Sequence, residues 1–119
     1  AGGSVRFPVH SSPSNAIIAS DEAQVEFDEV STTSLAAILC DHDIERVSLL
    51  KLDCEGAEYD IVFGLPTELW SRFEEIRMEY HHGRADELRV LLESQGFRTV
   101  LHTAYVIEGE ENGLLWFAR

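Results

Sequence analysis

The chain has 119 residues, of which 45% are hydrophobic and 26% charged, and these proportions fit one globular domain rather than a disordered or fibrous chain. Nine Lys and Arg against 22 Asp and Glu give a formal net charge of −13, which repels phosphate backbones and anionic lipid surfaces. We therefore expect neither nucleic acid nor a membrane as a direct partner. No stretch approaches the roughly 20 apolar residues of a membrane span, and residues 1–10 show no signal-peptide pattern, so we expect a cytoplasmic protein.

The N-terminal half of the sequence alternates between extended and helical patterns. In chain order we expect a strand over 4–9, a loop over 10–15, a strand over 24–30, a helix over 35–39, a buried strand over 47–53 and a helix over 56–64. The strands follow from period-two alternation or a short apolar run, and the helices from apolar side chains at helical spacing. Ser and Thr at 31–34 supply N-cap candidates for the first helix.

The C-terminal half continues with the same two kinds of pattern. In chain order we expect a short helix over 67–73 capped by Thr67, a strand over 75–81, a helix over 84–95 followed by the C-cap glycine Gly96, and strands over 97–106 and 113–118. The acidic, turn-forming residues 108–113 join the last two strands into an antiparallel hairpin. The order of elements predicts a single α/β domain over residues 1–119, with crossover connections first and a mixed sheet that ends in this hairpin.

Acidic and imidazole side chains follow the ends of two predicted strands, and in open α/β sheets ligands bind at such carboxyl ends. Asp53 closes an apolar run, where a carboxylate gains little from packing, so it could orient a substrate hydroxyl, take its proton or help bind a cation. Glu79 and His81 end the next strand, and a histidine can serve as general base or ligand. Glu55 and Glu58 also have a structural interpretation, because carboxylates at a helix N-terminus cap free N–H groups and oppose the helix dipole.

The two cysteines, Cys40 and Cys54, lie in apolar stretches without C-x-x-C spacing, so no disulfide framework or metal pattern is indicated. We interpret Cys54 as a small buried thiol rather than a nucleophile.

The segment LLKLDCEGAEYDIVFGL resembles the signature of the FkbM family of S-adenosylmethionine-dependent methyltransferases, and VEFDEVSTTSLAAIL, EIRMEYHHG, QGFRTV and ENGLLWFAR resemble its flanking elements in order. The resemblance implies a seven-stranded, Rossmann-like methyltransferase sheet, of which this chain supplies the fourth strand onward. It also implies transfer of a methyl group from S-adenosylmethionine to a substrate hydroxyl. It places Asp53 at the acceptor site and makes Glu55, Glu79 and His81 further candidate catalytic residues.

The family's glycine-rich loop and the acid that binds the cofactor ribose should precede Ala1, so we expect the N-terminal cofactor-binding half to be absent and the isolated chain to be inactive. Cofactor-binding residues stay unassigned. An alternative interpretation is a non-catalytic, stand-alone α/β binding or assembly module derived from this fold. A third is a metal-dependent hydrolase with Asp53, Glu55, Glu79 and His81 as ligands; it ranks last, and we assign no metal.

We expect the partner to be a small-molecule acceptor, such as a sugar or polyketide hydroxyl. In the complete family sheet the strand at 47–53 would be central, whereas here it would form an edge. An apolar, unpaired edge favours pairing with another chain. We therefore expect a homodimer or strand exchange through Val47 to Leu52, unless residues 24–30 cover this edge.

Overall fold

The computed structural model describes residues 3–8 and 27–119, and the chain falls into two compact units, Ala1–Ser34 and Leu35–Arg119. That residues 1–119 form one domain stays a prediction. In the first unit, β1 (Gly3–Pro8) pairs with β2 (Phe27–Thr32) in an antiparallel two-stranded sheet. β2 therefore joins β1 rather than the main sheet, which corrects the expected crossover from this strand. Residues 24–26 of the predicted second strand and the loop predicted at 10–15 lie outside the described residues.

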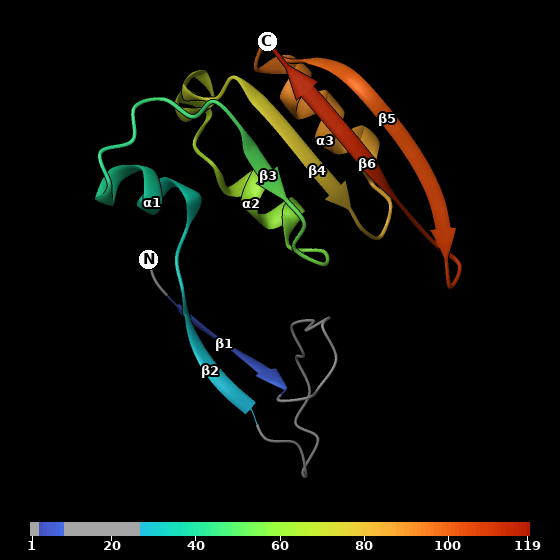
Figure 1. Cartoon of the computed structure of the whole chain (residues 1–119), viewed down its shortest axis with the longest axis horizontal. Coiled ribbons are helices and arrows are strands. Elements are labelled where there is room, and N and C mark those ends of the chain that lie inside the picture. The colour runs from blue at the N-terminus through green and yellow to red at the C-terminus, as the bar shows by residue number, and fades with distance from the viewer. Residues whose placement is uncertain (1–2, 9–26) are drawn as a thin grey trace. The chain divides into compact units, whose positions relative to one another are not determined.

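The second unit contains a four-stranded mixed sheet in the order β3-β4-β6-β5 (Figure 1). Its strands are β3 (Leu50–Leu52), β4 (Glu75–Tyr80), β5 (Arg98–Ile107) and β6 (Glu110–Ala118). β3 and β4 are parallel, with Leu52 opposite Met78, while β6 is antiparallel to both β4 and β5. The predicted α/β class, with a mixed sheet and a C-terminal antiparallel hairpin, is confirmed.

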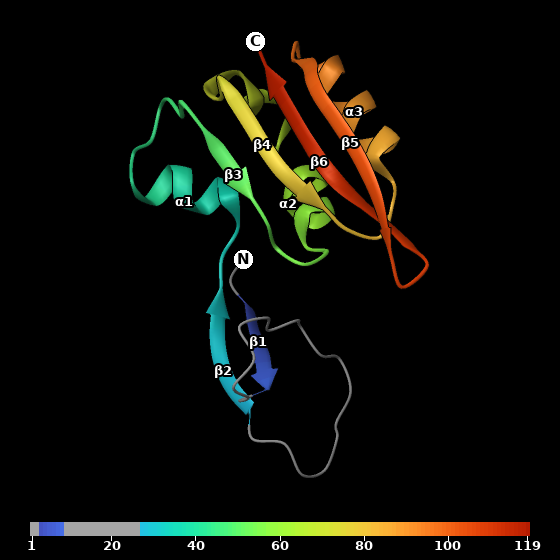
Figure 2. The same cartoon turned by 45° about the vertical axis from the view of Figure 1, so that its right-hand side comes forward.

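Three α-helices and one 3-10 helix accompany this sheet: α1 (Leu35–Asp41), α2 (Glu58–Gly64), η1 (Thr67–Arg72) and α3 (Ala85–Ser94). α2 and α3 lie on the same face of the sheet in both views (Figures 1 and 2). Gly96 has φ +92° just after α3, as expected for a C-terminal glycine. The prediction that Thr67 caps a helix is wrong, because Thr67 is the first residue of η1 and Pro66 holds the cap position. None of the described helices has the length and apolar character needed to cross a membrane.

The core lies between the sheet and the helices that cover one of its faces. Along β4 the side chains of Ile76, Met78 and Tyr80 are buried, whereas those between them face the opposite side, so the period-two pattern of this strand is confirmed. Leu88 and Leu92 of α3 are fully buried against the same cluster. Burial of each such side chain contributes about 1.5–3 kcal/mol, and the packed sheet provides the rigid support for the loops at its carboxyl edge.

The strand predicted at 47–53 is shorter than expected. Only residues 50–52 belong to β3, while Val47 forms an isolated parallel bridge with Phe73 and Leu49 is 48% exposed. Among the described strands, β3 pairs with β4 alone and so forms an edge of the main sheet, as the sequence predicts. Pairing of this edge with a second chain stays a prediction.

The closing hairpin turns more tightly than the sequence indicates. β5 and β6 extend to Ile107 and Glu110, and only Glu108 and Gly109 lie in the turn. Both have positive φ, 53° and 83°, which is the backbone conformation of the two-residue turns that match strand twist. The expected six-residue turn is therefore wrong, and the acidic residues after Gly109 belong to β6.

Candidate functional site

Three carboxylates lie at the turn after β3, and they differ in burial and in hydrogen bonding. Asp53 follows the last residue of β3 and is exposed. The chain then reverses through Glu55 and Gly56, which have φ values of 52° and 106°. Glu58 is fully buried, and its carboxylate accepts hydrogen bonds from the backbone N–H of Cys54 (2.7 Å) and of Gly56 (3.0 Å). Glu58 thus has a structural role, but it secures the turn that presents Asp53 and Glu55 instead of capping free N–H groups of α2.

His81 follows β4 and faces this turn. Its Nδ1 lies 3.1 Å from Oε1 of Glu58, and its Nε2 lies 3.6 Å from Oε2 of Glu55. An ionised carboxylate only accepts hydrogen bonds, so Nδ1 carries the proton in the bond to Glu58. The Tyr59 hydroxyl donates to the His81 carbonyl at 2.5 Å, which fixes the backbone at this point. The contact with Glu58 therefore orients the ring so that Nε2 faces Glu55.

Three of the four predicted site residues converge. One ligating atom from each of Asp53, Glu55 and His81 lies within 4.8 Å of the others. Glu79 is not part of this group, since its carboxylate instead accepts a hydrogen bond from the hydroxyl of Tyr105 on β5. That bond is the main cause of a raised pKa for Tyr105.

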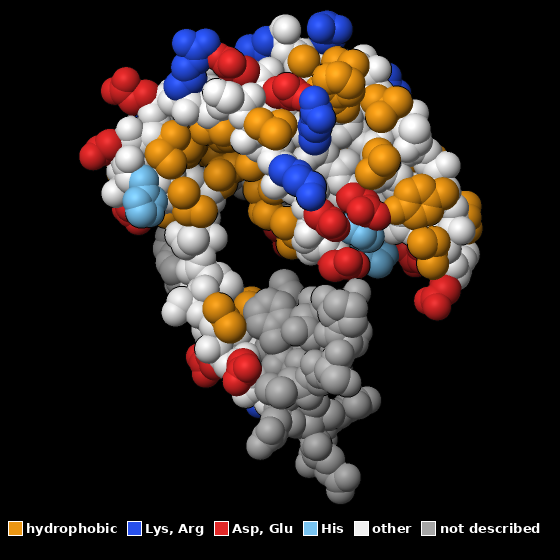
Figure 3. Space-filling view, in the orientation of Figure 1, with side chains coloured by type: hydrophobic (Ala, Val, Ile, Leu, Met, Phe, Trp, Pro, Cys, Tyr) orange, Lys and Arg blue, Asp and Glu red, His pale blue; other side chains and the backbone are white. Residues whose placement is uncertain are grey.

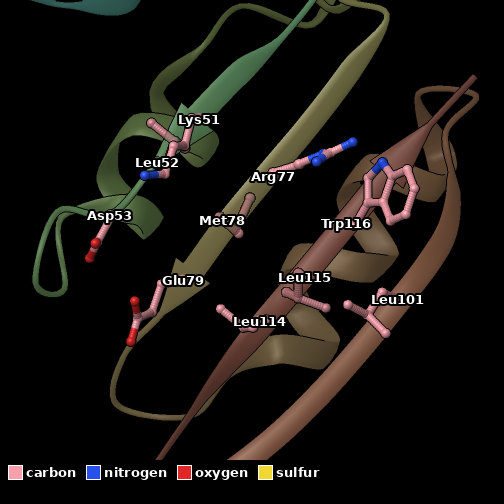
Figure 4. Close-up of a pocket in the computed structure, with 10 residues that line it drawn as sticks. All are labelled: Lys51, Leu52, Asp53, Arg77, Met78, Glu79, Leu101, Leu114, Leu115 and Trp116. Carbon is pink, nitrogen blue, oxygen red and sulfur yellow. The ribbon is translucent and has the colours of Figure 1, made fainter.

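The sheet face opposite α2 and α3 carries a hollow of about 370 Å³ (Figure 4). Asp53 and Glu79 lie at its end, beyond the Leu52–Met78 pair, at the carboxyl ends of β3 and β4. Arg77, two residues before Glu79, places its guanidinium 4.4 Å from the ring centre of Trp116. The positive side chains of this face thus lie further back along the strands, and the carboxyl ends are acidic.

A second, open cleft of about 560 Å³ lies between the turn after β3 and the β5–β6 hairpin. Its lining residues are Glu55, Glu79, His81, His82, Tyr105, Ile107, Glu108, Glu110 and Asn112. Figure 3 shows carboxylates grouped around histidines on the unit Leu35–Arg119. Neither lysine nor arginine occurs among the described residues that line this cleft, so it attracts cations and repels anions.

Two residues of this region could not be recognised as partners from the sequence. Tyr105 is 26 residues from Glu79 and reaches it only because β5 and β4 flank the same strand. The contact of Glu58 with His81 likewise joins the first turn of α2 to the residue that follows β4, 23 residues away in the sequence. Cys54 is half-buried, and desolvation is the main cause of a raised pKa of its thiol. The thiol stays protonated at neutral pH, which agrees with a packing role.

Residues 2–99 match the family described as the methyltransferase FkbM domain. The chain belongs to this family. Among curated relatives it is 29% identical to the AMB antimetabolite synthetase AmbE of Pseudomonas aeruginosa over 79% of this chain and 5% of that protein. It is 40% identical to methyltransferase 1 of Beauveria bassiana over 46% of this chain and 23% of that protein. It is 28% identical to the 31-O-demethyl-FK506 methyltransferase FkbM of Streptomyces tacrolimicus over 70% of this chain and 33% of that protein.

A solved structure of a putative tRNA (m1A22) methyltransferase from Streptococcus pneumoniae, in complex with S-adenosyl-L-methionine, is similar with a TM-score of 0.46. It is 20% identical, over 60% of this chain and 34% of that one. This chain spans a third or less of the length of the curated relatives named above.

Proposed function

We propose that this chain forms the acceptor-binding side of an S-adenosylmethionine-dependent O-methyltransferase. Membership of the FkbM methyltransferase family supports methyl transfer, and one relative is named for a demethylated oxygen position, which supports an oxygen acceptor. The observation that carries the proposal is the convergence of Asp53, Glu55 and His81 at the carboxyl ends of β3 and β4. Ligands of open α/β sheets bind at this edge.

The cofactor supplies a methyl group on a positively charged sulfur. When that group bonds to a hydroxyl oxygen, the sulfur keeps the electron pair of the broken bond and the hydroxyl proton has to leave. Asp53 is exposed beside His81, and in this proposal one of its carboxylate oxygens accepts the hydrogen bond of the hydroxyl and then its proton. A weak base suffices, because the oxygen becomes strongly acidic as its bond to carbon forms.

The described residues suit binding of the acceptor rather than binding of the cofactor. A strand-to-helix turn cradles an anionic group only with backbone N–H groups that are free. At the turn after β3, the N–H groups of Cys54 and Gly56 already donate to Glu58. We therefore assign no cofactor-binding residue here.

The lining of the cleft restricts the class of acceptor. Four glutamates lie along it, and the side chains of Tyr105 and Ile107 on β5 add apolar surface. An acceptor with a phosphate or carboxylate near the hydroxyl would be repelled. We propose a neutral hydroxyl on a partly apolar body, such as a sugar or polyketide. The acidic composition supports our placing this chemistry in the cytoplasm.

The test uses the protein that carries this chain, radiolabelled S-adenosylmethionine and a panel of neutral sugar and macrolide hydroxyl acceptors. We expect label to be incorporated at oxygen by the wild type. The Asp53→Asn variant should lose at least about 100-fold in rate, because it cannot accept the proton, yet bind S-adenosylhomocysteine within about twofold by calorimetry. The control Asp60→Asn removes an exposed carboxylate of α2 and should leave the rate unchanged.

Two results would overturn the proposal. Full activity of Asp53→Asn would show that this carboxylate does not face the acceptor. Transfer confined to nitrogen or carbon acceptors would exclude an O-methyltransferase. We further expect the 119-residue chain alone to show no saturable binding of S-adenosylhomocysteine below about 1 mM.

A further inference from the structure

Three side-chain atoms that can ligate a metal ion meet at one point beside the turn after β3. Asp53, Glu55 and His81 each offer one ligating atom there, all within 4.8 Å of one another. Nδ1 of His81 faces Glu58, so Nε2 is the ring nitrogen on the side of this point, 3.6 Å from a Glu55 oxygen. The two carboxylates at this distance repel one another unless a positive charge, from a proton or a metal ion, lies among the three groups.

Glu58 supplies an independent observation that favours the metal ion. It is not one of the three converging residues, is 0% exposed, and bonds the outer ring nitrogen of His81. In metal sites a carboxylate in this position fixes the tautomer and orientation of the ligating histidine and raises its basicity. Glu58 is itself held by two backbone N–H groups, so the position of the imidazole is determined before any ligand binds.

The negative charge of the surrounding side chains also favours binding of a cation. Besides Glu55, the cleft next to this point is lined by Glu79, Glu108 and Glu110. Of the described residues that line it, none is a lysine or arginine. The two histidines that line it each lie beside a glutamate, His81 beside Glu58 and His82 beside Glu110. A divalent ion would supply the missing positive charge.

We propose that Asp53, Glu55 and His81 bind a divalent transition-metal ion, with Glu58 as the residue that positions His81. Two carboxylate oxygens and one imidazole nitrogen suit Mn²⁺, Fe²⁺ or Zn²⁺ better than Mg²⁺ or Ca²⁺, which prefer oxygen ligands throughout. Metal–ligand bonds of about 2.1 Å require the three atoms to lie about 3–4 Å apart. The side chain of Glu55, 51% exposed, has the freedom to close that gap.

Three protein ligands leave coordination positions open towards the cleft. An acceptor oxygen can take one of them, while the second oxygen of the Asp53 carboxylate stays available for the hydroxyl proton. The ion would then lower the pKa of the bound hydroxyl and fix its position next to Asp53. This role rests on the proposed function, whereas binding of the ion by these side chains does not.

The test titrates the full chain with Mn²⁺, following free ion by electron paramagnetic resonance, and then displaces it with Zn²⁺. We expect one ion per chain to bind saturably below about 1 mM. Glu55→Gln should weaken binding at least about tenfold, and Glu58→Gln about 10–100-fold. The matched control Glu110→Gln changes an exposed carboxylate of the same cleft and should keep the wild-type affinity.

A second readout needs no variant, because bound Mn²⁺ should broaden the ring signals of His81 in wild-type NMR spectra at lower ion concentration than those of the other histidines. Absence of saturable binding would overturn the proposal, and so would equal weakening by Glu110→Gln and Glu55→Gln. If the protein that carries this chain transfers methyl groups at a rate that a chelator does not change, and the chain binds no Mn²⁺, the proposed function stands and the metal site is overturned. Specific Mn²⁺ binding without any methyl transfer would keep the metal site and overturn the proposed function.

Discussion

Substitution of Glu58 tests the view that one buried carboxylate holds the site together. Glu58→Ala leaves the backbone N–H groups of Cys54 and Gly56 without the acceptor they now have and removes the partner of His81. Each abandoned donor in a part-buried turn costs about 1–3 kcal/mol. We therefore expect a loss of about 4 kcal/mol in the free energy of unfolding, a large share of the roughly 5–15 kcal/mol that stabilises a typical domain. Glu58→Gln keeps one acceptor oxygen and should lose about half as much.

The assay is urea unfolding followed by tryptophan fluorescence. Both tryptophans, Trp70 and Trp116, belong to the unit Leu35–Arg119, so the signal reports the unit that contains Glu58. Asp60→Ala is the matched control: it removes an acid from the same first turn of α2, but one that is exposed, and should change stability by less than about 0.5 kcal/mol. A loss below about 1 kcal/mol for Glu58→Ala would refute the reasoning, since the hydrogen bonds would then contribute no more than bonds to water.

Four further predictions concern other parts of the chain. Gly113→Ala should destabilise by about 3 kcal/mol in urea unfolding, because the new Cβ would lie 1.9 Å from the Thr103 carbonyl oxygen; a loss under about 1 kcal/mol would contradict this. Glu108→Asn should raise the melting temperature slightly, since asparagine adopts the positive φ of this turn more readily. Burial is the main cause that raises the pKa of Tyr80 to about 12. The stabilisation that its protonated hydroxyl gives to the folded state is therefore complete below pH 10 and is lost as the pH rises to 12. Tyr80→Phe should make the free energy of unfolding less dependent on pH between these values. Pairing through the β3 edge predicts a dimer in sedimentation, and a monomer at high concentration would count against it.

The geometry of the acidic cleft connects the two proposals. A carboxylate that receives a hydroxyl proton needs no metal, but four glutamates and two histidines in one cleft exceed what proton transfer requires. The bond from Tyr105 to Glu79 shows that one of these acids already has a neutral partner. Asp53 and Glu55, with His81, have the arrangement that a cation would complete.

Local patterns in the sequence are sufficient for much of the fold. The alternation along β4, the leucine spacing of α3 and the glycine after it each depend on residues within one or two turns of chain, where the period of burial matches the period of the backbone. The segment LLKLDCEGAEYDIVFGL by itself indicates the family and places Asp53 at the end of a strand. The positions of Asp53, Glu55 and His81 at one edge follow from the rule that neighbouring parallel strands end together.

Only the tertiary structure decided which acid does what. Glu55 and Glu58 are equivalent by sequence pattern, but the positive φ of Glu55 turns one outward while the helix directs the other into the core beneath the turn. The late start of β3 at Leu50 and the bond between Tyr105 and Glu79 depend on contacts between segments more than 20 residues apart. Such contacts form because the sheet brings distant strands to neighbouring positions, and no local period in the sequence records that pairing.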